Sequence, residues 1–162
     1  FEEVKAEILK PLKTYEEGKG YTVTDDITPN YIRPKMFLFR LNKIMDEYAG
    51  GTSSWYTTNK PMLERALEEL RMLYEDSKFL GADGLHELMR AWENYHRLWT
   101  SEAHVRHLMF REETRYPGYY YRADFKEVLD QENWHVFTIS KWDPATREWS
   151  IRKEPVQNWL GL

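Results

Sequence analysis

One segment divides the chain into two kinds of sequence pattern. It runs from Arg115 to Phe125 and reads Arg-Tyr-Pro-Gly-Tyr-Tyr-Tyr-Arg-Ala-Asp-Phe. Helical periodicity stops before this segment, and the alternation of a β-strand begins after it. Because proline lacks an N–H donor and glycine weakens a helical turn, the segment predicts a compact turn rather than a regular helix.

The two arginines of this segment allow two roles. A guanidinium pairs bidentately with carboxylates or phosphates and stacks on aromatic faces. Arg115 and Arg122 are therefore expected either to form a structural lock with Asp124, Glu112 or a neighbouring domain, or to bind a nucleotide or single-stranded nucleic acid. The acidic surroundings favour the lock, but the residues alone leave both roles open.

The residues before the segment predict helices. Residues 2–16 form an amphipathic pattern that should kink or restart at Pro11. Residues 18–30 carry turn and loop chemistry, with room for a short extended piece at residues 21–24. This loop is expected to link the leading helix to the main body.

Four further helices are expected in the main body. The first starts at Pro34 and stops at Gly50-Gly51, and the second is opened by Asn59 or Thr58. The third covers residues 85–99, and Thr100 or Ser101 caps a fourth over residues 102–112. Short connections favour antiparallel neighbours and hence an up-and-down bundle.

The end of the chain predicts a β-hairpin, with one strand over residues 134–141 and the other over residues 150–154. The expected fold class is mainly α, an up-and-down antiparallel helical bundle with a C-terminal β-hairpin. The expected organisation is one domain overall, in which residues 1–30 form the leading helix and linker and residues 31–162 form the bundle, the tyrosine-rich turn and the hairpin.

Composition limits the function classes. The net charge is −4 and the pI is about 5.8, so no general attraction to nucleic acid is expected. No apolar run approaches the ~20 residues of a membrane span. The chain has no cysteine, which fits a cytoplasmic location and excludes thiolate ligation of zinc or an iron–sulfur cluster by this chain. Seven tryptophans and eleven tyrosines are typical either of a surface that packs on a partner or of an ordinary core.

Metal chemistry is weakly signalled. Glu93 and His96 have the Glu-x-x-His spacing of di-iron bundles, but such a site needs the motif twice. The histidines are more simply solvated or capping residues, so no metal ligand is expected. Neither a Ser, His and Asp set nor a glycine-rich phosphate loop after a strand is present in the sequence.

Three sequence stretches together resemble a known family. They are Glu113-Thr114-Arg115, then Gly118 to Phe125, then Asp130-Gln131-Glu132-Asn133-Trp134. They resemble the segment near the end of succinate dehydrogenase and fumarate reductase flavoproteins, which reads Glu-Ser-Arg-Gly-Ala-His-x-Arg-x-Asp-Tyr/Phe-Pro followed by an acidic Asn-Trp. The inserted Tyr116-Pro117, the tyrosines at the Ala-His positions and Lys126 in place of proline resemble the branch of dissimilatory adenylylsulfate reductase alpha subunits.

This resemblance implies the C-terminal helical domain of a much larger flavoprotein subunit. The parent enzyme would reduce adenylylsulfate to AMP and sulfite with FAD in the same subunit and electrons from an iron–sulfur beta subunit. The family's flavin-binding and substrate-contacting residues lie outside this chain, so the chain alone is expected to hold no cofactor and to be non-catalytic. The residues implied to dock it on the flavin domain are Arg115, Tyr119, Tyr120, Arg122, Asp124 and Trp134.

Overall fold

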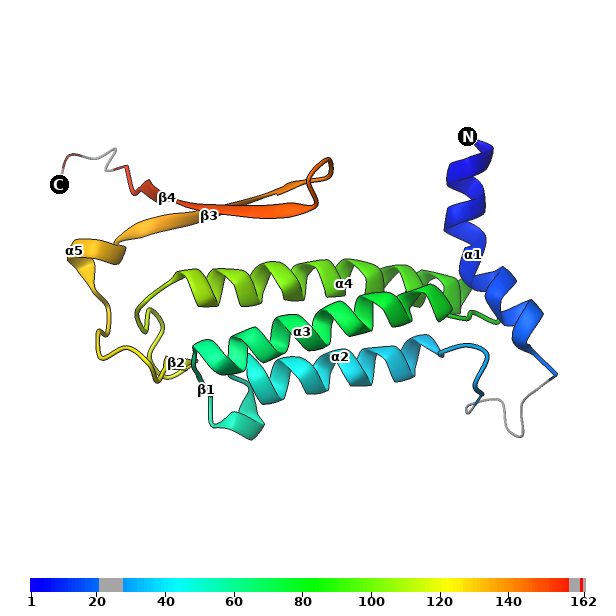
Figure 1. Cartoon of the computed structure of the whole chain (residues 1–162), viewed down its shortest axis with the longest axis horizontal. Coiled ribbons are helices and arrows are strands. Elements are labelled where there is room, and N and C mark those ends of the chain that lie inside the picture. Colours follow the sequence, from blue (N-terminus) through cyan, green and yellow to red (C-terminus); the bar gives the residue numbers. More distant parts are fainter. Residues whose placement is uncertain (21–27, 158–160, 162) are drawn as a thin grey trace. The chain divides into compact units, whose positions relative to one another are not determined.

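A computed structural model describes residues 1–20, 28–157 and 161. The short extended piece expected at residues 21–24 lies outside these described residues. The helices and strands are α1 Glu2–Gly18, α2 Pro34–Tyr48, β1 Thr57–Thr58, α3 Lys60–Asp76, α4 Leu85–Phe110, β2 Tyr121–Arg122, α5 Gln131–Trp134, β3 Val136–Asp143 and β4 Glu148–Pro155. The predicted mainly α fold, an up-and-down bundle with a C-terminal hairpin, is confirmed (Figure 1).

The chain divides into two compact units, and the helices α2, α3 and α4 contribute to both. The first unit consists of Phe1–Ile44 and Leu67–Ser101, and the second of Met45–Ala66 and Glu102–Leu162. The expectation that residues 18–30 link the leading helix to the main body stays a prediction.

In the first unit, apolar side chains of three helices form the core. Phe37 and Leu41 of α2 are buried together with residues of α3 and α4 that follow the helical period, namely Leu70, Leu73, Leu88, Ala91 and Leu98. The buried Asn94 side chain donates to the Pro34 carbonyl at 2.7 Å, which ties α4 to the first turn of α2. The stripe of apolar residues in the sequence therefore becomes the buried face of each helix.

The leading helix α1 passes through its proline. Pro11 is buried inside α1, and Figure 1 shows that the helix bends part-way along. The ring at Pro11 removes one helical donor and crowds the preceding turn, which explains the bend. The Pro11 carbonyl accepts the Ala82 N–H at 2.9 Å, and the Trp92 indole donates to the Ile8 carbonyl at 3.0 Å, so α1 is fastened within its own unit.

Caps set two of the helix boundaries as the sequence predicts. Gly50 has φ of +83°, the left-handed conformation that ends α2. The Asn59 side chain accepts the Met62 N–H at 3.0 Å, so Asn59 is the N-cap of α3.

Two predicted boundaries are wrong. The expected third and fourth helices are one continuous helix, α4, because the Thr100 hydroxyl donates to the His96 carbonyl at 2.9 Å instead of capping a new helix. Trp134, expected to open the first strand, ends the short helix α5. The Asp130 side chain caps α5 by accepting the Asn133 N–H at 3.0 Å.

The terminal hairpin is an antiparallel pair of eight-residue strands. Its register runs from Val136 opposite Pro155 to Asp143 opposite Glu148. Thr138 and the Trp142–Trp149 pair lie on one face, whereas Phe137 and Ile139 lie on the opposite, exposed face. β3 starts later than predicted, at Val136, but both strands reach further towards the turn than predicted, because the Trp142–Trp149 pair continues the ladder.

Candidate functional site

The tyrosine-rich segment folds as a tight turn in the second unit. The backbone N–H groups of Tyr119 and Tyr120 both donate to the Tyr116 carbonyl, at 3.0 and 3.2 Å. Gly118 has φ of +91°, and its N–H donates to the Tyr121 hydroxyl at 2.8 Å. The predicted compact turn is confirmed, and the left-handed glycine explains why the sequence needs Gly118 here.

Arg122 is buried beneath this turn and caps α4. Only 2% of the residue is exposed. Its guanidinium donates to the Leu108 and Arg111 carbonyls, the second at 2.6 Å, at the end of a helix whose last carbonyls have no helical partner. It also pairs bidentately with the Asp124 carboxylate, through Nε at 2.9 Å and Nη2 at 2.8 Å. The positive charge therefore lies at the negative end of the helix dipole.

Asp124 extends this network to the next helix. Its Oδ2 atom accepts the Lys60 N–H at 2.8 Å, in the first turn of α3. Desolvation raises the pKa of Asp124, but the hydrogen bonds and charge of Arg122 and the Lys60 N–H outweigh it, so the pKa lies below its ordinary value. The Arg122–Asp124 pair thus satisfies the C-terminal end of α4 and the N-terminal end of α3 together.

A second charged cluster surrounds Glu113, which the sequence reasoning missed as a site residue. Glu113 is fully buried, and its Oε1 atom accepts from Arg111 at 2.8 Å and from Arg115 at 2.6 Å. Its Oε2 atom accepts the Asp130 N–H at 2.6 Å. Arg115 therefore pairs with Glu113 and not with the expected Glu112. The signal in the sequence for this pair was the Glu-x-Arg pattern of Glu113 and Arg115, which places opposite charges two positions apart.

Trp134 belongs to the interior of the second unit. Only 6% of the residue is exposed, and its ring meets Phe110 edge-on with centroids 5.8 Å apart. The Arg111 guanidinium and the Lys153 ammonium lie over the ring at 5.4 and 3.4 Å from its centroid. Trp134 thus holds the start of the hairpin on the end of α4.

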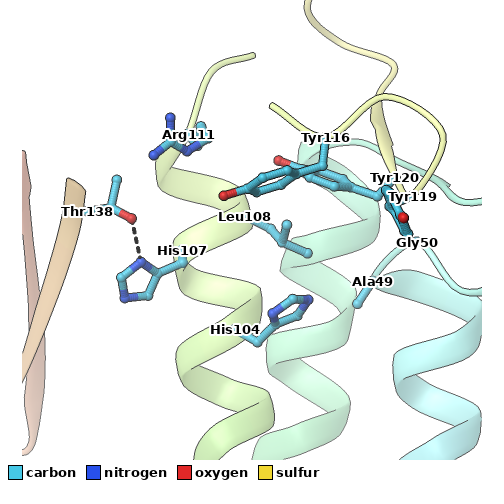
Figure 2. A pocket seen from close by; sticks show the side chains of 10 residues that line it. All are labelled: Ala49, Gly50, His104, His107, Leu108, Arg111, Tyr116, Tyr119, Tyr120 and Thr138. Atoms are coloured by element: carbon cyan, nitrogen blue, oxygen red, sulfur yellow. Dashed lines mark hydrogen bonds between the residues drawn. The ribbon is translucent and has the colours of Figure 1, made fainter. Parts of the chain in front are cut away.

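A groove of about 620 Å³ lies beside the turn (Figure 2). Figure 2 shows the rings of Tyr116, Tyr119 and Tyr120 on one side of it and the imidazoles of His104 and His107 projecting from α4. Tyr120 is half-buried against Gly50, whereas 80% of Tyr119 is exposed. Burial raises the pKa of Tyr120, so its hydroxyl stays protonated at neutral pH.

The two groove histidines are neutral at pH 7. Desolvation by the groove walls lowers the pKa of His104, although its side chain keeps solvent access, and repulsion from His107, when that residue is protonated, lowers it further. Desolvation lowers the pKa of His107, as does the charge of Arg111. His107 Nδ1 lies 2.8 Å from the Thr138 hydroxyl, marked by the dashed line in Figure 2, and this contact joins α4 to β3.

The arrangement offers little for cofactor chemistry. Among residues 1–20, 28–157 and 161, no group of three or more acidic or histidine side chains is placed to hold a metal ion. Arg111, the arginine that lines the groove, donates to Glu113 and to the carbonyls of Trp134 and Val136, so its guanidinium is already engaged within the unit.

A family match identifies the fold. Residues 40–159 match the family described as fumarate reductase flavoprotein C-term. The chain belongs to this family. The fumarate reductase flavoprotein C-terminal family is the one that the three quoted stretches resemble, so the resemblance stated from the sequence is confirmed.

The relatives within and around this family point to one branch. The chain is 51% identical over 154 residues to the adenylylsulfate reductase subunit alpha of Megalodesulfovibrio gigas, and the alignment covers 95% of this chain and 23% of that subunit. The adenylylsulfate reductase structure from the hyperthermophilic Archaeoglobus fulgidus matches with 50% identity and a TM-score of 0.94, over 99% of this chain and 25% of that one. Mycobacterium smegmatis Sdh1 in complex with UQ1 matches with 16% identity and a TM-score of 0.67, over 97% of this chain and 24% of that one, which shows the shared fold alone.

The chain therefore spans about a quarter of the length of these relatives. In the part of the chain that the structure describes, no helix has both the length and the apolar character of a membrane span. The alternative of an independent nucleic-acid module finds no support, because the guanidiniums of Arg115 and Arg122 are both engaged by carboxylates.

The structure brings some of the expected docking residues together and separates others. The buried Arg122 pairs with the solvent-accessible Asp124, Arg115 joins the Glu113 cluster, and Trp134 packs inside the second unit. Tyr119 instead projects into solvent. Their role in docking to a neighbouring domain stays a prediction.

Proposed function

We propose that this chain is the C-terminal docking domain of the alpha subunit of a flavin-dependent adenylylsulfate reductase. In this proposal the complete enzyme reduces adenylylsulfate to AMP and sulfite. FAD is held by the flavin domain of the same subunit, and electrons arrive from an iron–sulfur beta subunit. The domain supports the flavin domain and carries out no chemistry itself.

One observation carries the assignment to this branch. Identity is 51% and 50% to the two adenylylsulfate reductases but 16% to Sdh1, although all three matches cover at least 95% of the chain. A common ancestral fold accounts for the Sdh1 match. Identity at half of the positions over nearly the whole chain supports the narrower assignment.

The supporting role follows from where the charges are used. The buried guanidinium of Arg122 holds helix ends, and Glu113 holds two arginines and the loop before α5. These charged groups are therefore already engaged within the domain and are not free to bind an electron carrier. FAD, which the flavoprotein family implies for the complete subunit, is therefore assigned to residues outside this chain. A cytoplasmic location stays a prediction from the lack of cysteine.

The test compares the complete subunit with the 162-residue chain. The purified complete subunit should show the flavin absorbance band and, with its iron–sulfur partner and a reduced electron donor, should form sulfite from adenylylsulfate. The chain alone should show neither property when FAD is added. Stoichiometric FAD on the chain alone would contradict the docking role, and a flavin-loaded complete enzyme that leaves adenylylsulfate unchanged would contradict the branch.

A further inference from the structure

Two neighbouring loops of the second unit expose a set of aromatic rings. One loop leads from α2 to β1 and the other is the tyrosine-rich turn. They are joined by the Tyr121 N–H, which donates to the Tyr56 carbonyl at 2.6 Å, and by the parallel pairing of β1 with β2. The exposed rings, here called the aromatic loop surface, are Trp55, Tyr56, Tyr116, Tyr119 and Tyr121.

The backbone that presents Trp55 is strained. Trp55 has φ of 55° and ψ of 40°, and Tyr56 has φ of 57°, so two bulky residues in succession adopt the left-handed conformation. This conformation is unfavourable for any residue with a Cβ atom and uncommon for large side chains. Burial of the indole within this chain does not compensate for the strain, because 84% of Trp55 is exposed.

The strained loop is nevertheless held firmly. The Asp46 carboxylate accepts from the Thr52 hydroxyl at 3.0 Å and from the Ser53 N–H at 3.2 Å. The Trp55 N–H donates to the Thr52 carbonyl at 3.1 Å, and the Tyr56 N–H donates to the Gly51 carbonyl at 2.9 Å. Because these bonds fix the loop before any contact forms, the exposed indole is pre-organised for binding, as anchor residues at protein interfaces are.

We propose that the aromatic loop surface is the contact by which this domain docks on the part of the alpha subunit that precedes it in its relatives. This inference rests on the proposed function. The occupant follows from length: the relatives have about three quarters of their residues outside the matched region, and in the proposed function that large remainder belongs to the same subunit as this domain. Clustered, pre-organised aromatic rings are typical of the centre of such an interface.

The chemistry of the docking partner follows from what the surface presents. The nearby charges of Arg122, Asp124 and Glu113 are already paired inside the unit, so the rings are the main groups that this surface offers to a contact. A buried indole N–H or tyrosine hydroxyl needs an acceptor. The facing surface should therefore be apolar and carry carbonyl or carboxylate oxygens at its edge.

Hydroxyl-radical labelling of the complete alpha subunit tests the contact. Trp55 and Tyr119 should be labelled severalfold more slowly in the native subunit, prepared without its beta subunit, than in a tryptic digest of the same protein. Trp134 is buried within this domain and serves as the internal standard for folding. Equal labelling of Trp55 in the native subunit and in the digest, with Trp134 protected, would overturn the proposal. Protection that appears only with the beta subunit would assign the surface to that partner, and protection that rises with subunit concentration would assign it to a second copy. Either outcome would overturn the proposal.

A variant pair gives an independent readout. The double variant Trp55→Ala, Tyr119→Ala in the complete subunit should lower the urea concentration at which Tyr116 becomes accessible to the radical. The control Phe137→Ala removes an exposed ring of β3 outside the surface and should leave that concentration unchanged. Equal effects of the two variants would count against the docking role. Sulfite formation is measured on a portion of the wild-type subunit after its beta subunit and a reduced electron donor are added, so failure of the proposed function is distinguished from failure of the surface.

Discussion

Arg122 and Tyr119 lie three positions apart in one segment, but they serve opposite environments. Arg122 is 2% exposed and is bonded to a carboxylate and to the end of α4, whereas Tyr119 is 80% exposed. The same contrast separates the buried Glu113 from the exposed Trp55. The charged groups Arg122 and Glu113 hold the fold of this unit, whereas the rings of Trp55 and Tyr119 are exposed and, in our proposal, contact another surface. The segment therefore has two parts. Arg122 and Asp124 hold helix ends within the unit, whereas the ring of Tyr119 is exposed on its surface.

The largest loss of stability is expected when the Arg122 guanidinium, which caps the end of α4, is removed. Arg122→Leu leaves two helix-end carbonyls without their donor and removes the cationic partner of Asp124, which should lower the free energy of unfolding by about 2–4 kcal/mol. Urea unfolding followed by circular dichroism measures the loss. Arg152→Leu is the matched control, because Arg152 on β4 forms an exposed pair with Glu154 that should contribute at most about 1 kcal/mol. A similar small loss for both variants would mean that the buried Arg122 guanidinium does not stabilise the helix ends.

Removing the charge at Glu113 should have the next largest effect. Glu113→Gln keeps the size of the side chain but leaves Arg111 and Arg115 without a buried anion, and we expect a loss of about 1–3 kcal/mol. Glu112→Gln, the exposed neighbour, should leave the urea midpoint almost unchanged. Equal midpoints for the two variants would show that the buried cluster adds nothing to stability.

Helix boundaries with local chemical signals were predictable from the sequence. Asn59 caps α3 through its own side chain, and Gly50 ends α2 through its own backbone conformation. Each signal needs only residues a few positions away. The continuity of α4 was missed because the Thr100 hydroxyl serves equally well as a cap or as a donor to the preceding turn, and only the structure shows which bond it makes.

The buried cluster and the strained loop were not predictable in the same way. Glu113 is fully buried only because Arg111, Arg115 and the Asp130 N–H converge on it, and the last of these lies seventeen positions along the chain. The left-handed backbone at Trp55 opposes local preference, so it results from the hydrogen bonds made by Asp46 and the strand pairing of β1. Long-range contacts override local propensity at both places.

Stability should depend on pH through His107 in the groove beside the tyrosine-rich turn. The pKa of His107 is lowered in the folded chain by desolvation and by Arg111, so the unfolded chain binds the proton more readily. Stability should therefore be unaffected by this residue above the unfolded pKa of about 6.5 and should fall as pH decreases through it towards the folded pKa. The effect should be modest, because the groove is open to solvent. Urea midpoints at pH 8 and at about pH 5.5 should differ less in His107→Gln than in the wild-type chain, and an unchanged difference would exclude His107 as the source.

The smallest effect concerns the exposed Trp55, whose left-handed backbone is unfavourable for any side chain with a Cβ atom. Glycine adopts the left-handed conformation without a Cβ penalty, so Trp55→Gly should be more stable than Trp55→Ala by about 0.5–1 kcal/mol in the isolated chain. At Trp99, inside α4, the order should reverse, and Trp99→Gly should be less stable than Trp99→Ala by about 1 kcal/mol. Both pairs lose an indole, so the difference within each pair reports the backbone alone. The same order at the two positions would show that the loop is not strained in solution. If glycine is the more stable variant at position 55 and alanine at position 99, the backbone at Trp55 is strained. A strained, exposed tryptophan is expected when the ring serves a contact beyond this domain.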